Sequence, residues 1–264
     1  NLYNQSKIYL DAIPTISTPA GARSPNANAS ITDRVYKGTM FINYNGHGNT
    51  QVWTEERILT QDDFKKWNND KMLPFMVTAT CDFGQFDHPQ YVSAAEQLVL
   101  RNGGGVIAML TTTAAVYANY NTPLNLIFIE TLFSQNANGT WHSFGDAARI
   151  GKNEAYTVSK DPNKLANYRK FALLGDPALL PNFPEQFVAI DTITDVAKGT
   201  PSDTVKALGA YRISGHVRDN SGNVSNSSGQ YTSIALRKLQ SQVLNLALNA
   251  LENIPVEKRL QGSM

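Results

Sequence analysis

The chain has 264 residues, of which 42% are hydrophobic, so it can bury one good core or two smaller ones, and we expect two. Its net charge is only +1 and no basic run is interleaved with aromatic residues, which argues against a nucleic-acid partner. No apolar run approaches the roughly 20 residues that span a bilayer, and residues 1–4 lack the pattern of a signal peptide. We therefore expect the chain to be part of a longer protein.

The elements predicted in the first part of the chain lead to a histidine. Residues 7–12 are predicted as a strand, residues 14–30, with Pro, Gly and Ser, as a long loop, and residues 31–37 as a short helix. A short strand over residues 40–44 ends at residues 45–48, where two glycines flank His47 and force a turn.

A second series of elements leads to a cysteine and continues beyond it. Thr60 and Asp63 have the spacing of a capping box, which predicts a helix start at residue 60. A strand is predicted over residues 75–80 and delivers Cys81. The later elements follow in order: a helix over 93–101, a buried strand over 105–110, a helix over 125–133, and a helix over 144–156 that Ser143 caps. This alternation predicts an α/β fold with a mostly parallel sheet flanked by helices.

The pattern changes near residue 181. Short alternating runs at residues 188–191, 211–217 and 231–236, separated by turn-rich segments, predict part of a β-sandwich. The tail beyond residue 238 has leucines at helical spacing and fits no sandwich edge. We therefore expect three parts: residues 1–181, residues 182–238 and an unassigned helical tail or discontinuous segment, 239–264.

Cys81 is the only cysteine, which excludes an internal disulfide and any site with several cysteine ligands. No two of the four histidines have the spacing of metal ligands, so we expect neither a metal nor a cofactor. An odd cysteine is instead a candidate free nucleophile.

His47 and Cys81 are predicted to meet. If the strands over 40–44 and 75–80 are parallel neighbours, both side chains emerge at the carboxyl edge of one sheet, where ligands bind in open α/β folds. The separation, 81 − 47 = 34 residues, is long enough for one crossover. An imidazole there can take the thiol proton and later protonate a leaving amine. The backbone N–H groups of Gly48 and Cys81 could then approach a developing oxyanion.

Each feature also has a simpler explanation. A single buried cysteine is usually inert packing, and a Gly-His-Gly turn is usually only a turn. The juxtaposition of both at strand ends favours a catalytic pair, but periodicity alone leaves both interpretations open.

The segments around these residues resemble the gingipain-type cysteine peptidases, which have a caspase-like fold. The resemblance rests on residues 43–48, Trp53, Leu59, Thr60, Thr80, Cys81 and residues 85–87. Residues 171–178 are similar to the segment that closes the peptidase domain of that family. The resemblance covers roughly residues 7–181, and the later strands resemble part of the immunoglobulin-like domain that follows. It implies that the amino-terminal part of the peptidase domain precedes Asn1.

The resemblance also implies roles for residues. Cys81 matches the nucleophile, His47 the general base and acid, and Gly48 the oxyanion glycine. Tyr117 falls where the family places an aromatic wall of the pocket for the residue before the cut, although it could be an ordinary surface aromatic. The acid that orients the histidine has no clear counterpart: Asp11 and Asp33 are upstream candidates, and the acid could also precede Asn1.

In its details the chain is most similar to the family member that acts as signal peptidase and sortase of the type IX secretion system. This implies a peptidase that cleaves carboxyl-terminal sorting signals from exported proteins. It also implies that the enzyme transfers the cleaved proteins to a cell-surface lipopolysaccharide acceptor. It also implies an outer-membrane partner of that system and a peripheral location at the cell surface. Two alternatives stay open: a secreted gingipain-like endopeptidase, and a catalytically silent surface scaffold, which the intact His47, Gly48 and Cys81 disfavour.

Overall fold

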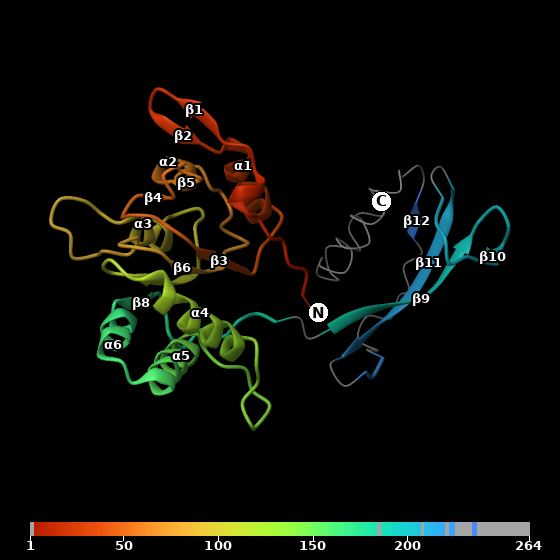
Figure 1. The fold of residues 1–264 in the computed structure, drawn as a ribbon. Helices are drawn as coiled ribbons and strands as arrows, with labels where there is room; N and C mark the ends of the chain where they lie inside the picture. Colours follow the sequence, from red (N-terminus) through yellow and green to blue (C-terminus); the bar gives the residue numbers. More distant parts are fainter. Residues whose placement is uncertain (1–2, 184–185, 207–208, 220–221, 225–233, 237–264) are drawn as a thin grey trace. The chain divides into compact units, whose positions relative to one another are not determined.

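The computed structural model describes residues 3–183, 186–206, 209–219, 222–224 and 234–236 (Figure 1). The chain forms two compact units, Lys7–Asn182 and a second unit made of Asn1–Ser6 with Phe183–Met264. The predicted limits 1–181 and 182–238 stay a prediction, and the predicted tail, 239–264, lies outside the described residues.

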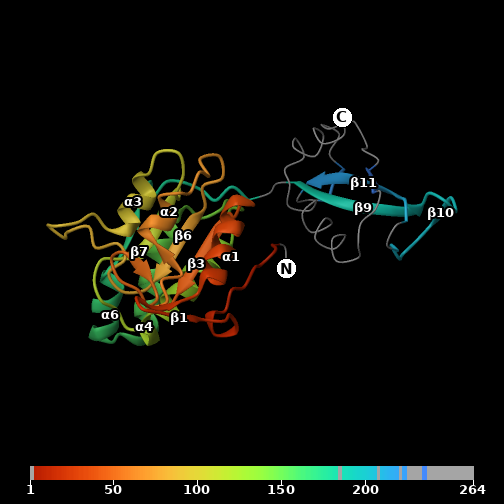
Figure 2. The ribbon, with the colours of Figure 1, turned by 90° about the horizontal axis from the view of Figure 1, so that it is seen from above.

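A four-stranded sheet forms the centre of the first unit. Its strands, in spatial order, are β3 (Phe41–Asn45), β6 (Phe75–Ala79), β7 (Ala108–Thr112) and β8 (Phe171–Leu174). The first three are parallel, and β8 runs antiparallel to β7. Figure 2 shows β3, β6 and β7 side by side. The predicted α/β fold with a mostly parallel sheet is confirmed.

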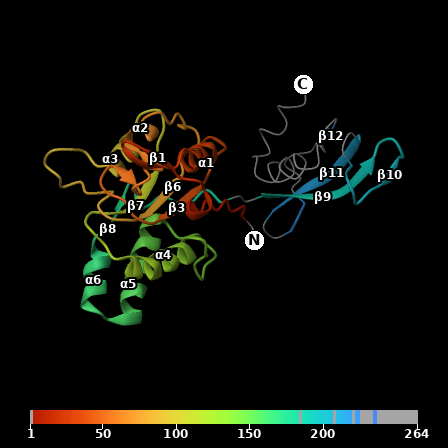
Figure 3. The ribbon, with the colours of Figure 1, turned by 45° about the horizontal axis from the view of Figure 1, so that its top comes forward.

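Helices cover both faces of this sheet (Figure 3). One face carries α1 (Pro25–Tyr36), α2 (Gln61–Phe64) and α3 (Ala94–Leu100), and the other carries α4 (Ala118–Leu132), α5 (Phe144–Ser159) and α6 (Pro162–Arg169). Alternation along the strands divides the core in two, since Met76 of β6 packs with the first group of helices and Val77 with the second. All five residues of β6 are buried, as expected for a strand covered on both sides.

Several boundaries differ from the sequence prediction. Residues 7–12 form no strand, and Leu10–Ala12 (η1) is a single 3-10 turn. None of the three residues of this turn is buried, so pairing them with a sheet would gain little stabilisation from apolar burial. The predicted loop over 14–30 contains a hairpin, β1 (Ile16–Thr18) with β2 (Gly21–Arg23), and the start of α1. Pro25 opens α1 because its fixed φ and missing N–H suit the first helical position.

The predicted helix caps are confirmed. The Thr60 hydroxyl accepts from the Asp63 N–H, and the Asp63 carboxylate accepts from the Thr60 N–H at 2.8 Å. Ser143 caps α5 in the predicted way by accepting from Asp146 N. Between β3 and α2 the chain makes a second hairpin, β4 (Val52–Trp53) with β5 (Leu59–Thr60).

The second unit contains an antiparallel sheet. Its strands, in spatial order, are β10 (Thr200–Pro201), β9 (Gln186–Asp195), β11 (Tyr211–Asp219) and β12 (Ile234–Leu236). The strands predicted from the alternating pattern are thus present, and within the described residues they form one sheet, so the sandwich and its immunoglobulin-like character stay a prediction. Among the described helices, none combines the length and the apolar character needed to cross a membrane.

Candidate active site

The parallel pairing of β3 with β6 brings the histidine and cysteine loops to one edge of the sheet. The last residue pair of this ladder is Asn45 opposite Ala79, and His47 and Cys81 each follow two residues later. The Gly46 N–H donates to the Ala79 carbonyl at 3.4 Å and extends the contact. The predicted strand arrangement is therefore correct, and both residues lie at the carboxyl edge.

The histidine loop also packs directly against the residue that precedes the cysteine. A Cβ added to Gly48 would lie 2.6 Å from Thr80 Oγ1 and 2.9 Å from the Val52 carbonyl oxygen, so no larger residue fits without displacement. The Thr80 hydroxyl is buried and has no hydrogen-bond partner within the described residues. Gly48 is thus required by space as well as by any role of its N–H.

The backbone around His47 is fixed by the β4–β5 hairpin. The His47 carbonyl accepts two hydrogen bonds, from Tyr44 Oη at 2.5 Å and from Thr54 N at 2.9 Å. The Tyr44 ring stacks on Trp53, with centroids 4.1 Å apart and planes 5° apart. Burial, with a smaller contribution from Glu56, raises the pKa of Tyr44 well above its ordinary value of 10.0, so its hydroxyl is a donor at neutral pH.

The N–H groups of Gly48 and Cys81 are unengaged among the described residues. Gly48 pairs with Trp53 in a bridge whose hydrogen bonds are made by the neighbours: Thr54 N to the His47 carbonyl, and Asn49 N to the Val52 carbonyl at 3.0 Å. In such a pair the central N–H points away from the partner strand. Both donors predicted to form the oxyanion hole are therefore free to bind a substrate oxygen, and that role stays a prediction.

The loop after Cys81 turns sharply and is anchored to β7. Asp82 has a left-handed φ of 56°, a conformation that aspartate tolerates better than most residues. The Gly84 N–H donates to the Thr112 carbonyl at 2.8 Å. A Cβ on Gly84 would lie 2.2 Å from Thr111 Cγ2, so this loop too needs glycine for its close approach.

Tyr117 follows a residue that contacts the sulfur. Cys81 Sγ donates to the Val116 carbonyl at 3.5 Å. Tyr117 itself is 66% exposed, and its N–H donates at 2.8 Å to Oδ1 of the buried Asn167. The structure therefore brings Tyr117 beside the cysteine on an anchored loop, and its role as a pocket wall stays a prediction.

No acid orients the histidine within the described residues, where the His47 imidazole makes no hydrogen bond. Asp33, an upstream candidate, forms an exposed ion pair with Lys37 at 2.8 Å, and Asp11 lies in the 3-10 turn. The described residues also contain no group of three His, Cys, Asp or Glu side chains arranged to hold a metal.

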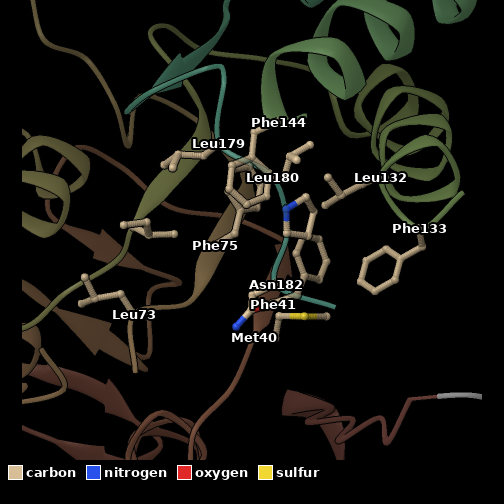
Figure 4. A pocket seen from close by; sticks show the side chains of 12 residues that line it. Met40, Phe41, Leu73, Phe75, Leu132, Phe133, Phe144, Leu179, Leu180 and Asn182 are labelled. Carbon is tan, nitrogen blue, oxygen red and sulfur yellow. The ribbon is translucent and has the colours of Figure 1, made fainter. Parts of the chain in front are cut away.

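An apolar cavity and a polar cleft lie in different parts of this unit. An apolar cavity of about 160 Å³ is lined by Phe41 and Phe75, the first residues of β3 and β6, and therefore lies at the edge opposite Cys81. Figure 4 shows its side chains, among which Phe75 and Phe144 stack at 3.9 Å. A polar cleft of about 580 Å³ lies instead on the β4–β5 hairpin, whose Val52 contributes to its lining.

Comparisons with known proteins agree with the α/β fold of this unit. The profile of peptidase family C25 matches residues 1–182. The fold is similar to the crystal structure of the Arg specific cysteine proteinase gingipain R (RGPB), with a TM-score of 0.55 and 18% identity over 83% of this chain and 50% of that one. A complex of Porphyromonas gingivalis RgpB pro- and mature domains gives a TM-score of 0.55 and 16% identity, over 79% of this chain and 56% of that one. The chain thus spans about half the length of these structures. A search of curated proteins finds no significant match.

Proposed function

Since the chain belongs to peptidase family C25, the gingipain family of cysteine peptidases, we propose that it breaks peptide bonds through a thioester on Cys81. The observation that carries the proposal is the contact of Gly48 with Thr80, which holds the histidine loop against the cysteine loop. The register of β3 and β6 independently sets both loops at one sheet edge.

The proposed reaction uses groups that lie at this edge. His47 takes the proton of the Cys81 thiol, and the thiolate attacks the carbonyl carbon of the scissile bond. The resulting oxyanion accepts hydrogen bonds from the N–H groups of Gly48 and Cys81. As the C–N bond breaks, His47 gives its proton to the leaving amine, and a thioester remains. Water or an amine then attacks the thioester, with His47 removing a proton from the attacking group.

The substrate pocket is proposed to include Tyr117. The preceding carbonyl, of Val116, lies 3.5 Å from Cys81 Sγ, so an exposed ring on the next residue is well placed to flank the side chain before the scissile bond. Such a wall would select by contact and would leave the nucleophile itself unchanged.

We further propose that the chain is a homologue of PorU, the signal peptidase and sortase of the type IX secretion system. Its substrates would be exported proteins with carboxyl-terminal sorting signals, and its acceptor a cell-surface lipopolysaccharide. The protein would lie peripherally at the outer membrane with a partner of that system. The support is the sequence resemblance over residues 43–48 and around Cys81.

The polar cleft supports transfer to an acceptor. It is lined by carboxylates and guanidinium groups, among them Glu56, Asp62, Arg23 and Arg57, and Val52 of the β4–β5 hairpin contributes to the lining. A cleft of this character suits an acceptor that carries an amine and anionic groups. For the cleft to serve this purpose, an acceptor bound in it must extend its amine to Cys81. An amine held within reach of the thioester has a higher effective concentration than in free solution, which favours transfer over hydrolysis.

The test is to incubate the full-length enzyme with an exported substrate and a nucleophilic amine, and then to weigh the processed product. Transfer predicts a product heavier than the hydrolysed form by the amine adduct, and Cys81→Ala should yield neither product. If only the hydrolysed mass appears at high amine concentration with native surface acceptors present, the sortase proposal fails and the endopeptidase takes its place. Unchanged processing by Cys81→Ala would contradict the thioester itself.

A further inference from the structure

Tyr44 reaches the histidine loop from within β3. Its ring is held by stacking on the buried Trp53, and its hydroxyl extends beyond the ring to the His47 carbonyl at 2.5 Å. Gly46 makes this path possible, because a Cβ there would lie 2.7 Å from Tyr44 Oη. The hydroxyl therefore passes through space that glycine leaves open and ends on the peptide group between His47 and Gly48.

That peptide group is the one that carries the Gly48 N–H. A peptide unit is planar and trans, so its C=O and N–H point in opposite directions and cannot turn independently. Any contact that fixes the His47 carbonyl also fixes the direction of the Gly48 N–H. The Gly48 N–H has no hydrogen-bond partner of its own in the described residues. Its direction is therefore set by the contacts of the His47 carbonyl, on the opposite side of the same peptide group.

The carbonyl is fixed by two donors. Thr54 N–H donates to it at 2.9 Å, in addition to the Tyr44 hydroxyl. Thr54 has a φ of 59°, which is strained for a β-branched residue, and such strain tends to be kept where it has a use. Rotating the peptide would break both hydrogen bonds. A carbonyl that accepts hydrogen bonds also polarises its peptide, which makes the attached N–H a better donor.

We propose that Tyr44 is a positioning residue of the oxyanion hole, and that its hydroxyl sets the direction and donor strength of the Gly48 N–H through the shared peptide plane. The inference rests on the proposed function, because it presumes acyl transfer at Cys81. Burial and the neighbouring Glu56 carboxylate raise the pKa of Tyr44 further above an ordinary value that already exceeds neutral pH, so the hydroxyl stays a donor over the whole neutral range.

The test is Tyr44→Phe in the full-length protein, because this variant keeps the ring and its stacking and removes only the hydroxyl. Two reactions of Cys81 are compared. Turnover of a peptide or ester passes through an oxyanion, whereas alkylation by iodoacetamide does not: sulfur bonds to the methylene carbon and iodide leaves. We expect kcat to fall roughly tenfold or more with KM nearly unchanged. The alkylation rate should stay within about twofold, since no oxyanion forms in it.

Tyr36→Phe is the matched control. The Tyr36 hydroxyl also donates to a backbone carbonyl, that of Lys66 at 3.0 Å, and it accepts from the Asn68 N–H at 3.3 Å, both outside the histidine loop. This variant should leave kcat unchanged and lower the melting temperature at least as much as Tyr44→Phe does, because it removes two hydrogen bonds where Tyr44→Phe removes one. If kcat falls tenfold in Tyr44→Phe and not in Tyr36→Phe, the loss comes from the position of the Tyr44 hydroxyl at the histidine loop and not from lower stability.

Two results would overturn the inference. If turnover and alkylation fall together in Tyr44→Phe, the hydroxyl supports His47 or the fold and not the oxyanion donor. If neither changes, the hydroxyl has no part in the reaction. Failure of the proposed function gives a different result: the Cys81→Ala variant would then turn over substrate as fast as the wild-type protein does. The inference would fail with it.

Discussion

Three glycines at the carboxyl edge of the sheet are required by the space around them. A Cβ on Gly46, Gly48 or Gly84 would lie 2.7, 2.6 or 2.2 Å from a neighbouring side-chain atom. None of the three has the left-handed φ that usually explains glycine in a turn. Their common effect is that the histidine loop, the cysteine loop and β7 approach one another closely.

Tyr117→Ala tests whether this side chain forms a wall of the proposed substrate pocket. We expect kcat/KM to fall about tenfold, the effect of losing one apolar contact with the substrate. Alkylation of Cys81 should stay nearly intact, because the Val116 carbonyl that contacts the sulfur is unchanged in this variant. Tyr9→Ala is the matched control, since Tyr9 and Tyr117 are 64% and 66% exposed. A loss of alkylation equal to the loss of turnover would mean that Tyr117 supports the fold.

Sequence reasoning placed His47 and Cys81 at one edge because each follows a short apolar strand, a pattern that is local and periodic. The support for His47 could not be found in this way. Thr54 reaches its carbonyl because the chain turns back after His47, and the Tyr44 hydroxyl reaches it across Gly46; neither contact leaves a periodic signal in the sequence. The one available hint was an aromatic residue three positions before the histidine, inside a strand that otherwise ends in a glycine turn.

At the scale of elements, the caps were predictable and the short polar elements were not. Thr60 and Ser143 are N-cap residues whose side chains accept local hydrogen bonds, and residue type and spacing alone predict these bonds. Helix α6 was missed because it shows little apolar periodicity, although Asp161 before Pro162 is a start signal. Strand β8 was also missed: residues 171–178 were identified only by resemblance, and a short apolar run does not reveal the direction in which a strand pairs.

Helix α6 has a function that its sequence did not suggest, which Asn167→Leu tests. Asn167 Oδ1 accepts from the Tyr117 N–H at 2.8 Å and its Nδ2 donates to Asn121 Oδ1 at 2.9 Å. Leucine would leave both groups unpaired, so we expect a loss on the order of 2 kcal/mol in the free energy of unfolding. A loss of kcat/KM should accompany it, because the segment beside Cys81 loses its anchor.

The measurement is urea unfolding, with Asn163→Ala as the control on the same helix. Asn163 is exposed and its side chain makes no hydrogen bond within the described residues, so this variant should stay within about 0.5 kcal/mol of the wild type. Equal stability of Asn167→Leu and the wild type would show that the amide anchors nothing.

At the scale of the whole molecule, the sheet separates structure from chemistry. Two apolar cores, one on each face, hold the strands in place, and the residues proposed to touch the substrate, His47, Gly48, Cys81 and Tyr117, follow the carboxyl ends of these strands. The apolar cavity lies at the other edge, away from Cys81. This division explains why composition and periodicity predict the layers of the fold. The roles of the loop residues follow no periodic pattern, so they were assigned by resemblance.

The rate at which an electrophilic thiol probe labels Cys81 in the full-length protein measures whether His47 and Cys81 work as a pair. We expect faster labelling than that of a free model thiol at neutral pH, because a neighbouring imidazole can take the thiol's proton. His47→Ala should slow the labelling several-fold, and His142→Ala, a change at a histidine outside the loop, should not. Labelling at the rate of a free thiol that ignores the His47 substitution would contradict the pair.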